Sequence, residues 1–120
     1  MAVRAIRGAT TVDADTVDQV TGRVQALVQA LLERNDLGHE DLISMVFTAT
    51  DDVVCMFPAA AARAMGLGDV PLLCARELAV TASTPRCIRV LAHVETGRPR
   101  SELHHVYLEG AHDLRDDLPS

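Results

Sequence analysis

The chain has 120 residues, of which 48% are hydrophobic, 23% charged and 2% aromatic, and its formal net charge is −6 at pH 7. This apolar content excludes a disordered chain, and no apolar run approaches the ~18 residues that a membrane span needs. The acidic balance and the scarcity of aromatic rings argue against nucleic acid as a partner. The N-terminal residues show no apolar leader, so we expect a single cytoplasmic domain over residues 1–120.

The first half of the chain predicts two strands on either side of a long helix. Residues 1–8 alternate in the manner of a strand. Apolar residues then recur at helical spacing over residues 16–34, and Asp13 or Asp15 is the expected cap at the start of that helix. Residues 42–50 are apolar on both faces, which is typical of a strand that is covered on both sides.

The second half predicts a short helix and three more strands. Residues 53–56 suit a short extended piece, and Pro58 fits the first position of a helix that runs to Met65. Further strands are expected at residues 70–75, 87–95 and 103–109. Residues 110–120 form an acidic tail that we expect to be loosely held.

These elements predict an α+β fold in which a mixed five-stranded sheet packs with one long and one short helix. One long helix cannot cover both faces of such a sheet. An apolar face left without a cover favours burial against another copy of the chain, so we expect a homo-oligomer.

Arginines within apolar strands are the first candidate functional residues. All eleven basic residues are arginines, which is typical of a high-GC bacterial source, but Arg7 and Arg89 lie among apolar neighbours where an unpaired charge is costly. One interpretation is an internal ion pair, with Glu77 as the partner. The other is an anion site, because the guanidinium fork matches carboxylates; two arginines and one glutamate suit a small polycarboxylate with a hydroxyl group.

Other chemistry finds little support in the sequence. The three cysteines form no C-x-x-C pair, and His104 and His105 are adjacent strand residues that point to opposite faces, so no metal site is predicted. Tyr107, the sole tyrosine, suits packing as well as function. Without a recognisable nucleophile or general base, the sequence favours a ligand-binding protein or an enzyme that works by electrostatics alone.

Three motifs add a family resemblance. IRGATTV at residues 6–12, CIRV at 87–90 and HVYLE at 105–109 occur in this order, with Phe-Pro-Ala at 57–59 between the first two. The combination resembles the monofunctional, trimeric chorismate mutases of the α/β type. The resemblance covers nearly the whole chain.

The resemblance implies a homotrimeric pseudo-α/β-barrel with active sites between subunits. It implies the Claisen rearrangement of chorismate to prephenate, an isomerisation in phenylalanine and tyrosine biosynthesis (the shikimate pathway), without a metal or an organic cofactor. Two rivals stay open: a trimeric carboxylate-binding module without turnover, and a small trimeric deaminase or hydrolase.

By this resemblance, four residues are the expected catalytic set. Arg89 would donate to the ether oxygen whose bond breaks, and Glu77 would accept from the ring hydroxyl. Arg7 and Tyr107 would hold the carboxylate of the enolpyruvyl side chain.

Further residues are expected to bind the substrate by resemblance. Those lining the cleft from the neighbouring subunit would be Phe57, Ala59, Arg63, Leu72, Leu73 and Cys74. Leu114 and Arg115 in the tail would close over the ligand. The family often has lysine where this chain has Ala60 and threonine where it has Leu73, and we expect these departures to affect affinity more than chemistry.

Overall fold

The computed structural model describes residues 1–112 and 114. The strands are β1 (Ala2–Thr11), β2 (Leu42–Ala49), β3 (Leu72–Arg76), β4 (Cys87–Thr96) and β5 (Val106–Tyr107). The helices are α1 (Val17–Arg34) and α2 (Pro58–Ala62), with shorter turns at η1 (His39–Asp41), η2 (Arg63–Leu67), η3 (Arg100–Glu102) and η4 (Glu109–Ala111). No helix in the described part of the chain is long and apolar enough to cross a membrane.

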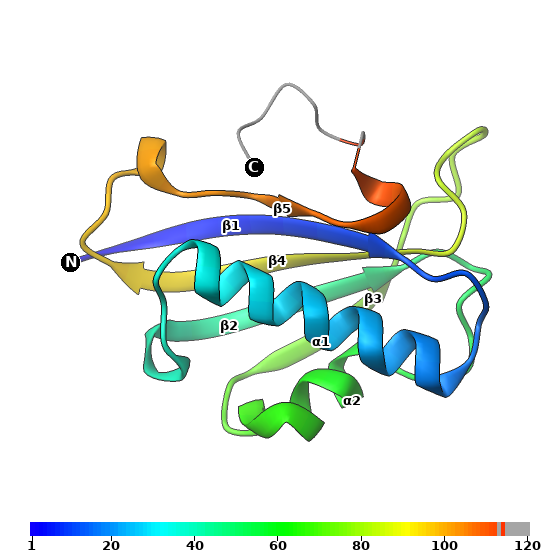
Figure 1. The fold of residues 1–120 in the computed structure, drawn as a ribbon, viewed down its shortest axis with the longest axis horizontal. Helices are drawn as coiled ribbons and strands as arrows, with labels where there is room; N and C mark the ends of the chain where they lie inside the picture. The colour runs from blue at the N-terminus through cyan, green and yellow to red at the C-terminus, as the bar shows by residue number, and fades with distance from the viewer. Residues whose placement is uncertain (113, 115–120) are drawn as a thin grey trace.

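The five strands form one mixed sheet in the order β3-β2-β4-β1-β5 (Figure 1). β4 pairs antiparallel with both β1 and β2, whereas the outer strands β3 and β5 pair parallel with β2 and β1. The predicted five-stranded mixed sheet with one long and one short helix is therefore confirmed.

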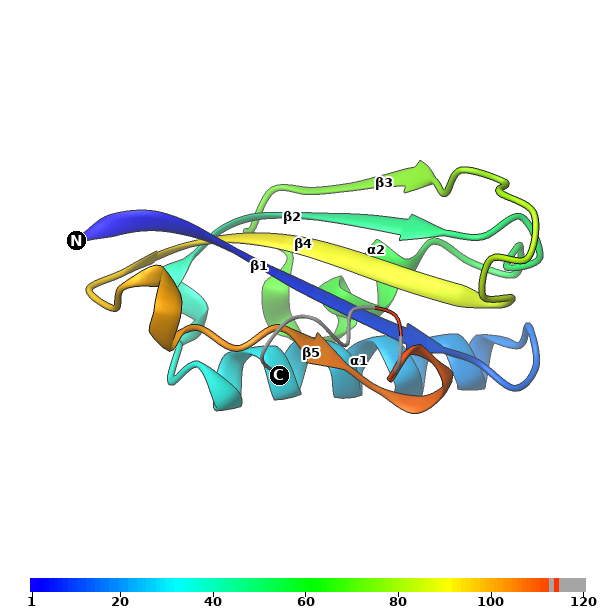
Figure 2. The ribbon, with the colours of Figure 1, turned by 90° about the horizontal axis from the view of Figure 1, so that it is seen from above.

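Both helices lie on the same side of this sheet (Figure 2). Val20, Val24, Leu27, Val28 and Leu31 of α1 are buried against the strand residues that point toward the helix, among them Ile6, Phe47 and Ile88. β4 alternates as the sequence predicts, because Val90 is buried while Arg89 is half-buried on the opposite face. Within the described chain the helices cover only one face of β2, so a cover on its other face, expected from another copy of the chain, stays a prediction.

The start of α1 differs from the prediction. Thr16 is the N-cap, and its hydroxyl accepts from the Gln19 N–H. Asp15 instead accepts from the backbone N–H groups of Val54 and Cys55. This contact organises the segment before α2 as a loop, so the extended piece expected at residues 53–56 is wrong.

β1 is longer than predicted. It continues past Gly8 to Thr11 because β4 offers partners along its whole length, ending with the pair Thr11 and Cys87. β3 is shifted toward Arg76, since Pro71 has no N–H and only its carbonyl takes part, accepting from Met45.

β5 is shorter than predicted because side chains replace its first ladder bonds. The Asn35 side-chain amide donates to the His104 carbonyl and accepts from the His104 N–H. Nδ1 of His105 accepts from the Arg7 N–H. Beyond β5, Ala111 is completely buried in η4, so the tail is not loosely held at that residue. The remainder of the expected tail, Asp113 and residues 115–120, lies outside the described residues.

Candidate active site

A cavity of about 320 Å³ opens on the sheet face that carries no helix. The strands β1, β2, β4 and β5 supply its walls, together with Glu77 just beyond β3. Its lining residues are Arg7, Gly8, Val46, Thr48, Glu77, Arg89, Val90, Leu91 and Tyr107. The four residues expected to be catalytic thus converge on one cavity from four separate segments.

Arg89 and Glu77 form the ion pair that the sequence left as one of two alternatives. Nε of Arg89 lies 3.1 Å from Oε2 of Glu77. The Arg89 side chain is 39% exposed and the Glu77 side chain is 22% exposed. The Nε–H is not aligned for a hydrogen bond and has no acceptor among the described residues. The ion pair is therefore confirmed, and the anion site stays a prediction for which the partly exposed guanidinium at the cavity is available.

Thr48 completes this group. Its hydroxyl donates to Oε2 of Glu77 at 2.6 Å, a short distance that is typical of a bond to a charged acceptor. Thr48 lies directly opposite Arg89 in the β2–β4 register. The carboxylate is therefore held beside Arg89 by a neighbour on the adjacent strand.

Arg7 and Tyr107 form the opposite part of the wall. The backbone N–H of Arg7 donates to Nδ1 of His105 at 2.9 Å, which ties β1 to the segment leading into β5. Tyr107 is 7% exposed and packs with Ala9, Cys87 and Ala111. The tyrosine thus both packs and lines the cavity.

Cys87 lies in that packed cluster, two residues before Arg89. Burial raises the pKa of its thiol, and the nearby Arg89 charge opposes the shift only in part. The thiol is therefore a packing group rather than a nucleophile.

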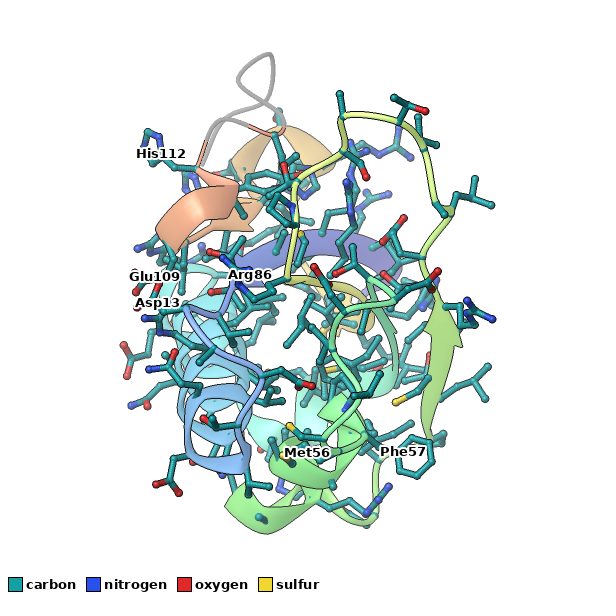
Figure 3. The ribbon with its side chains drawn as sticks, turned by 90° about the vertical axis from the view of Figure 1, so that its right-hand side faces the viewer. Asp13, Met56, Phe57, Arg86, Glu109 and His112 are labelled. Carbon is teal, nitrogen blue, oxygen red and sulfur yellow. The ribbon has the colours of Figure 1, made fainter. Side chains whose placement is uncertain are left out.

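A second, larger cavity of about 750 Å³ lies elsewhere on the chain and shares no lining residue with the first. Phe57 and Cys74 line it, with Val54, Met56 and Ala60 among the other walls. Phe57 is 70% exposed, and Figure 3 shows its ring beside α2, away from Glu109 and His112. An exposed aromatic ring at an apolar cavity is typical of a surface that contacts another molecule.

The model for the family described as chorismate mutase type I matches residues 3–118. The chain belongs to the type I chorismate mutase family. Chorismate mutases are isomerases, so the predicted family and enzyme class are both confirmed.

Two curated relatives carry the name chorismate mutase AroH. The protein from Thermus thermophilus is 46% identical over 119 residues, which are 98% of each chain. The protein from Bacillus subtilis is 40% identical over 119 residues, which are 98% of this chain and 94% of that protein. A solved chorismate mutase from Clostridium thermocellum has a TM-score of 0.88 at 44% identity, covering 90% of this chain and 96% of that one.

The remaining predicted binding residues of this chorismate mutase chain are dispersed. Ala59 is buried in the main core, whereas Arg63 is exposed at the start of η2 and lines neither cavity. Leu72 packs on the core, and Leu73 is 63% exposed. Leu114 packs against the Tyr107 cluster, and Arg115 lies outside the described residues.

The sequence interpretation missed Thr48, Val46 and Leu91, which line the first cavity. Strand alternation was the available signal, because Val46 and Thr48 are two residues apart and share a face of β2. No cluster of three or more metal-ligating side chains occurs among residues 1–112 and 114.

Proposed function

We propose that this chain converts chorismate to prephenate at the cavity formed by Arg7, Glu77, Arg89 and Tyr107. The observation that carries the proposal is the convergence of two arginines, a glutamate and a tyrosine on one cavity, in a chain of the type I chorismate mutase family. Chorismate is a dicarboxylate with a ring hydroxyl. Arginine forks suit its carboxylates, and a carboxylate oxygen suits its hydroxyl.

The reaction needs no proton transfer and no nucleophile. Within one molecule, the ether C–O bond breaks while a C–C bond forms, so no atom is gained or lost. The protein's task is to hold the reactive conformer and to stabilise the negative charge that develops on the ether oxygen. The Arg89 guanidinium suits this second role, because it is a cation that lines the cavity and stays 39% exposed beside Glu77.

The other residues have complementary roles in this proposal. Arg7 and Tyr107 hold the carboxylate of the enolpyruvyl side chain, and Glu77 accepts from the ring hydroxyl. Glu77 also faces the part of the ring that becomes electron-poor. The guanidinium stabilises the negative charge on the ether oxygen and the carboxylate stabilises the positive charge on the ring, so together they lower the energy of the charge-separated transition state.

We propose that the active unit is a homotrimer with sites between subunits. The sheet face without helices exposes Val3, Leu73 and Leu91, an apolar surface that a second copy would bury. The cavity with Phe57 would then supply the second wall of a neighbour's site. Ala60 lines that cavity, so its lack of a charged side chain is expected to weaken affinity rather than chemistry.

The deciding experiment mixes purified protein with chorismate and follows its ultraviolet absorbance. Loss of chorismate at about 1–1,000 per second, with prephenate as the sole product, is the expected result. Binding without turnover would instead support a carboxylate-binding module. Since both curated relatives come from bacteria, a bacterial cytoplasmic biosynthetic enzyme is the setting that we propose.

A further inference from the structure

We propose that Thr48 is a positioning residue for the reaction: its hydroxyl holds the Glu77 carboxylate in place beside the Arg89 guanidinium on the cavity wall. This inference rests on the proposed function and assigns a role at the same cavity to a side chain outside the expected catalytic set.

The backbone explains why Thr48 reaches both groups. Thr48 and Arg89 are directly opposed partners in the β2–β4 ladder. Glu77 follows β3 on the other side of β2, and its N–H donates to the Ala49 carbonyl at 3.0 Å. Thr48 therefore lies on the strand between the two charged residues, on the face where both side chains meet.

The carboxylate of Glu77 is held through one oxygen. Oε2 accepts the Thr48 hydroxyl at 2.6 Å and lies 3.1 Å from Nε of Arg89. Oε1 accepts no hydrogen bond from any described residue. The Thr48 hydrogen bond thus selects a carboxylate orientation in which one oxygen remains for a hydroxyl of the ligand.

The same hydrogen bond keeps the Glu77 carboxylate out of line with Arg89. Nε of Arg89 lies 3.1 Å from Oε2, but its N–H is buried and misaligned. Without the Thr48 hydroxyl, Glu77 is free to turn and engage the guanidinium more fully. The charge of Arg89 would then be offset by its own protein, and the carboxylate oxygen meant for the ring hydroxyl would leave its place.

The test replaces Thr48 with valine, which keeps the branched shape and removes the hydroxyl. We expect Thr48→Val to lower kcat about tenfold with little change in KM, because the Arg89 donor acts in the transition state. Thr48→Ser should restore most of the loss, since it returns the hydroxyl. Wild-type kcat in Thr48→Val, or a serine variant as slow as the valine variant, would overturn the inference.

A double-mutant cycle shows whether Thr48 acts through Glu77. In a Glu77→Ala background, Thr48→Val should change kcat less than twofold, because the group that it positions is gone. If Glu77→Ala is too slow for a steady-state assay, single-turnover rates with enzyme in excess provide the same cycle. A full tenfold loss of rate in both backgrounds would mean that Thr48 acts in another way.

Thr10→Val is the matched control. Thr10 is also a strand threonine, but it is fully buried on the helix side of β1 and its hydroxyl has no partner among the described residues. Its kcat and KM should match wild type.

If Thr48→Val does not fold, the smaller Thr48→Ala takes its place. A wild-type protein without turnover would overturn the proposed function itself, whereas an active wild type with a fully active Thr48→Val overturns only the role of Thr48.

Discussion

At the scale of single residues, the candidate site depends on how Arg89 is paired. A fully buried ion pair would satisfy the guanidinium internally, but here both side chains stay partly exposed at a cavity. The guanidinium thus remains a partly exposed cationic donor at the cavity wall. Pre-organised donors of this kind lower a barrier because they need not reorganise during the reaction.

Removing that donor gives the first prediction. Arg89→Ala should lower kcat by about two to three decades, because one such donor is typically worth roughly 3–4 kcal/mol in the transition state. The measurement is steady-state turnover of chorismate, with circular dichroism to verify the fold. Near-normal turnover in a folded variant would show that Arg89 does not have the proposed role.

Asp52 gives a residue-scale prediction about stability. Its carboxylate accepts from the Thr50 hydroxyl and from the Arg86 N–H. The Thr50 hydrogen bond is the main cause that holds its pKa below the ordinary 3.8, against a smaller opposing effect of burial. A lowered pKa in the folded state means that the ionised group stabilises the fold above its unfolded pKa, and that this stabilisation is lost as the pH falls through the folded pKa.

We therefore expect Asp52→Asn to be less stable than wild type at pH 7, with the two converging as the pH falls below about 4. Thermal unfolding from pH 2 to pH 7 measures this, with the exposed Glu95→Gln as a charge-matched control. A stability difference that stays constant over the whole range would contradict the assigned cause.

At the scale of elements, close packing between β1 and its neighbours holds the site's strands in place. A Cβ on Gly8 would lie 3.1 Å from Cδ1 of Leu27, 3.2 Å from the carbonyl oxygen of Val106 and 3.2 Å from Cγ1 of Val90. The contacts come from α1, β5 and β4, so three elements approach one glycine. Arg7 directly precedes Gly8 on β1, so its position at the cavity depends on this close packing.

Gly8→Ala should consequently destabilise the protein by about 1–3 kcal/mol, as overpacking does, because the backbone oxygen of Val106 cannot move independently of its strand. Urea unfolding at a fixed protein concentration measures the change. Gly22→Ala is the control, since a Cβ added at Gly22 would have nothing within 4 Å and alanine is the better helix former. Equal stability of Gly8→Ala and wild type would show that the strands can separate freely.

At the scale of the whole molecule, the two cavities are on separate parts of one chain. Only the smaller one carries Arg7, Glu77, Arg89 and Tyr107, while Phe57 lines the larger. The helices cover one face of the sheet (Figure 2), and apolar side chains are exposed on the other face. In a closed ring of several copies, each contact joins two different surfaces of neighbouring chains. Such a ring would place the smaller cavity of one chain against the larger cavity of the next.

Mixing two inactive variants tests this arrangement. Arg89→Ala damages one proposed wall, and Phe57→Asp, which adds a carboxylate where a dicarboxylate would bind, damages the other. Co-expressed subunits should therefore form some sites with both walls intact. With random assembly, roughly a quarter of the sites would be intact, and the mixture should regain about that share of wild-type turnover. Turnover equal to the mean of the two parents would place all the required residues on a single chain.

Features that repeat locally along the chain could be predicted from the sequence. The apolar stripe of α1 and the alternation of Val90 with Arg89 in β4 follow from the fixed repeats of helix and strand, so both were predicted correctly. The motifs around Arg7, Arg89 and Tyr107 likewise indicated the family from the amino-acid sequence alone. These signals depend on residues that are near one another in the chain.

Contacts between distant segments could not be predicted in this way, because they depend on how the whole chain folds. The side chain of His105 ends the pairing of β5, and Asp15 binds the segment before α2 instead of capping α1. Thr48 meets Glu77 because the register of β2 with its two neighbours sets them side by side, 29 residues apart in the chain. Strand register follows from packing of the whole sheet, and no local pattern in the sequence encodes it.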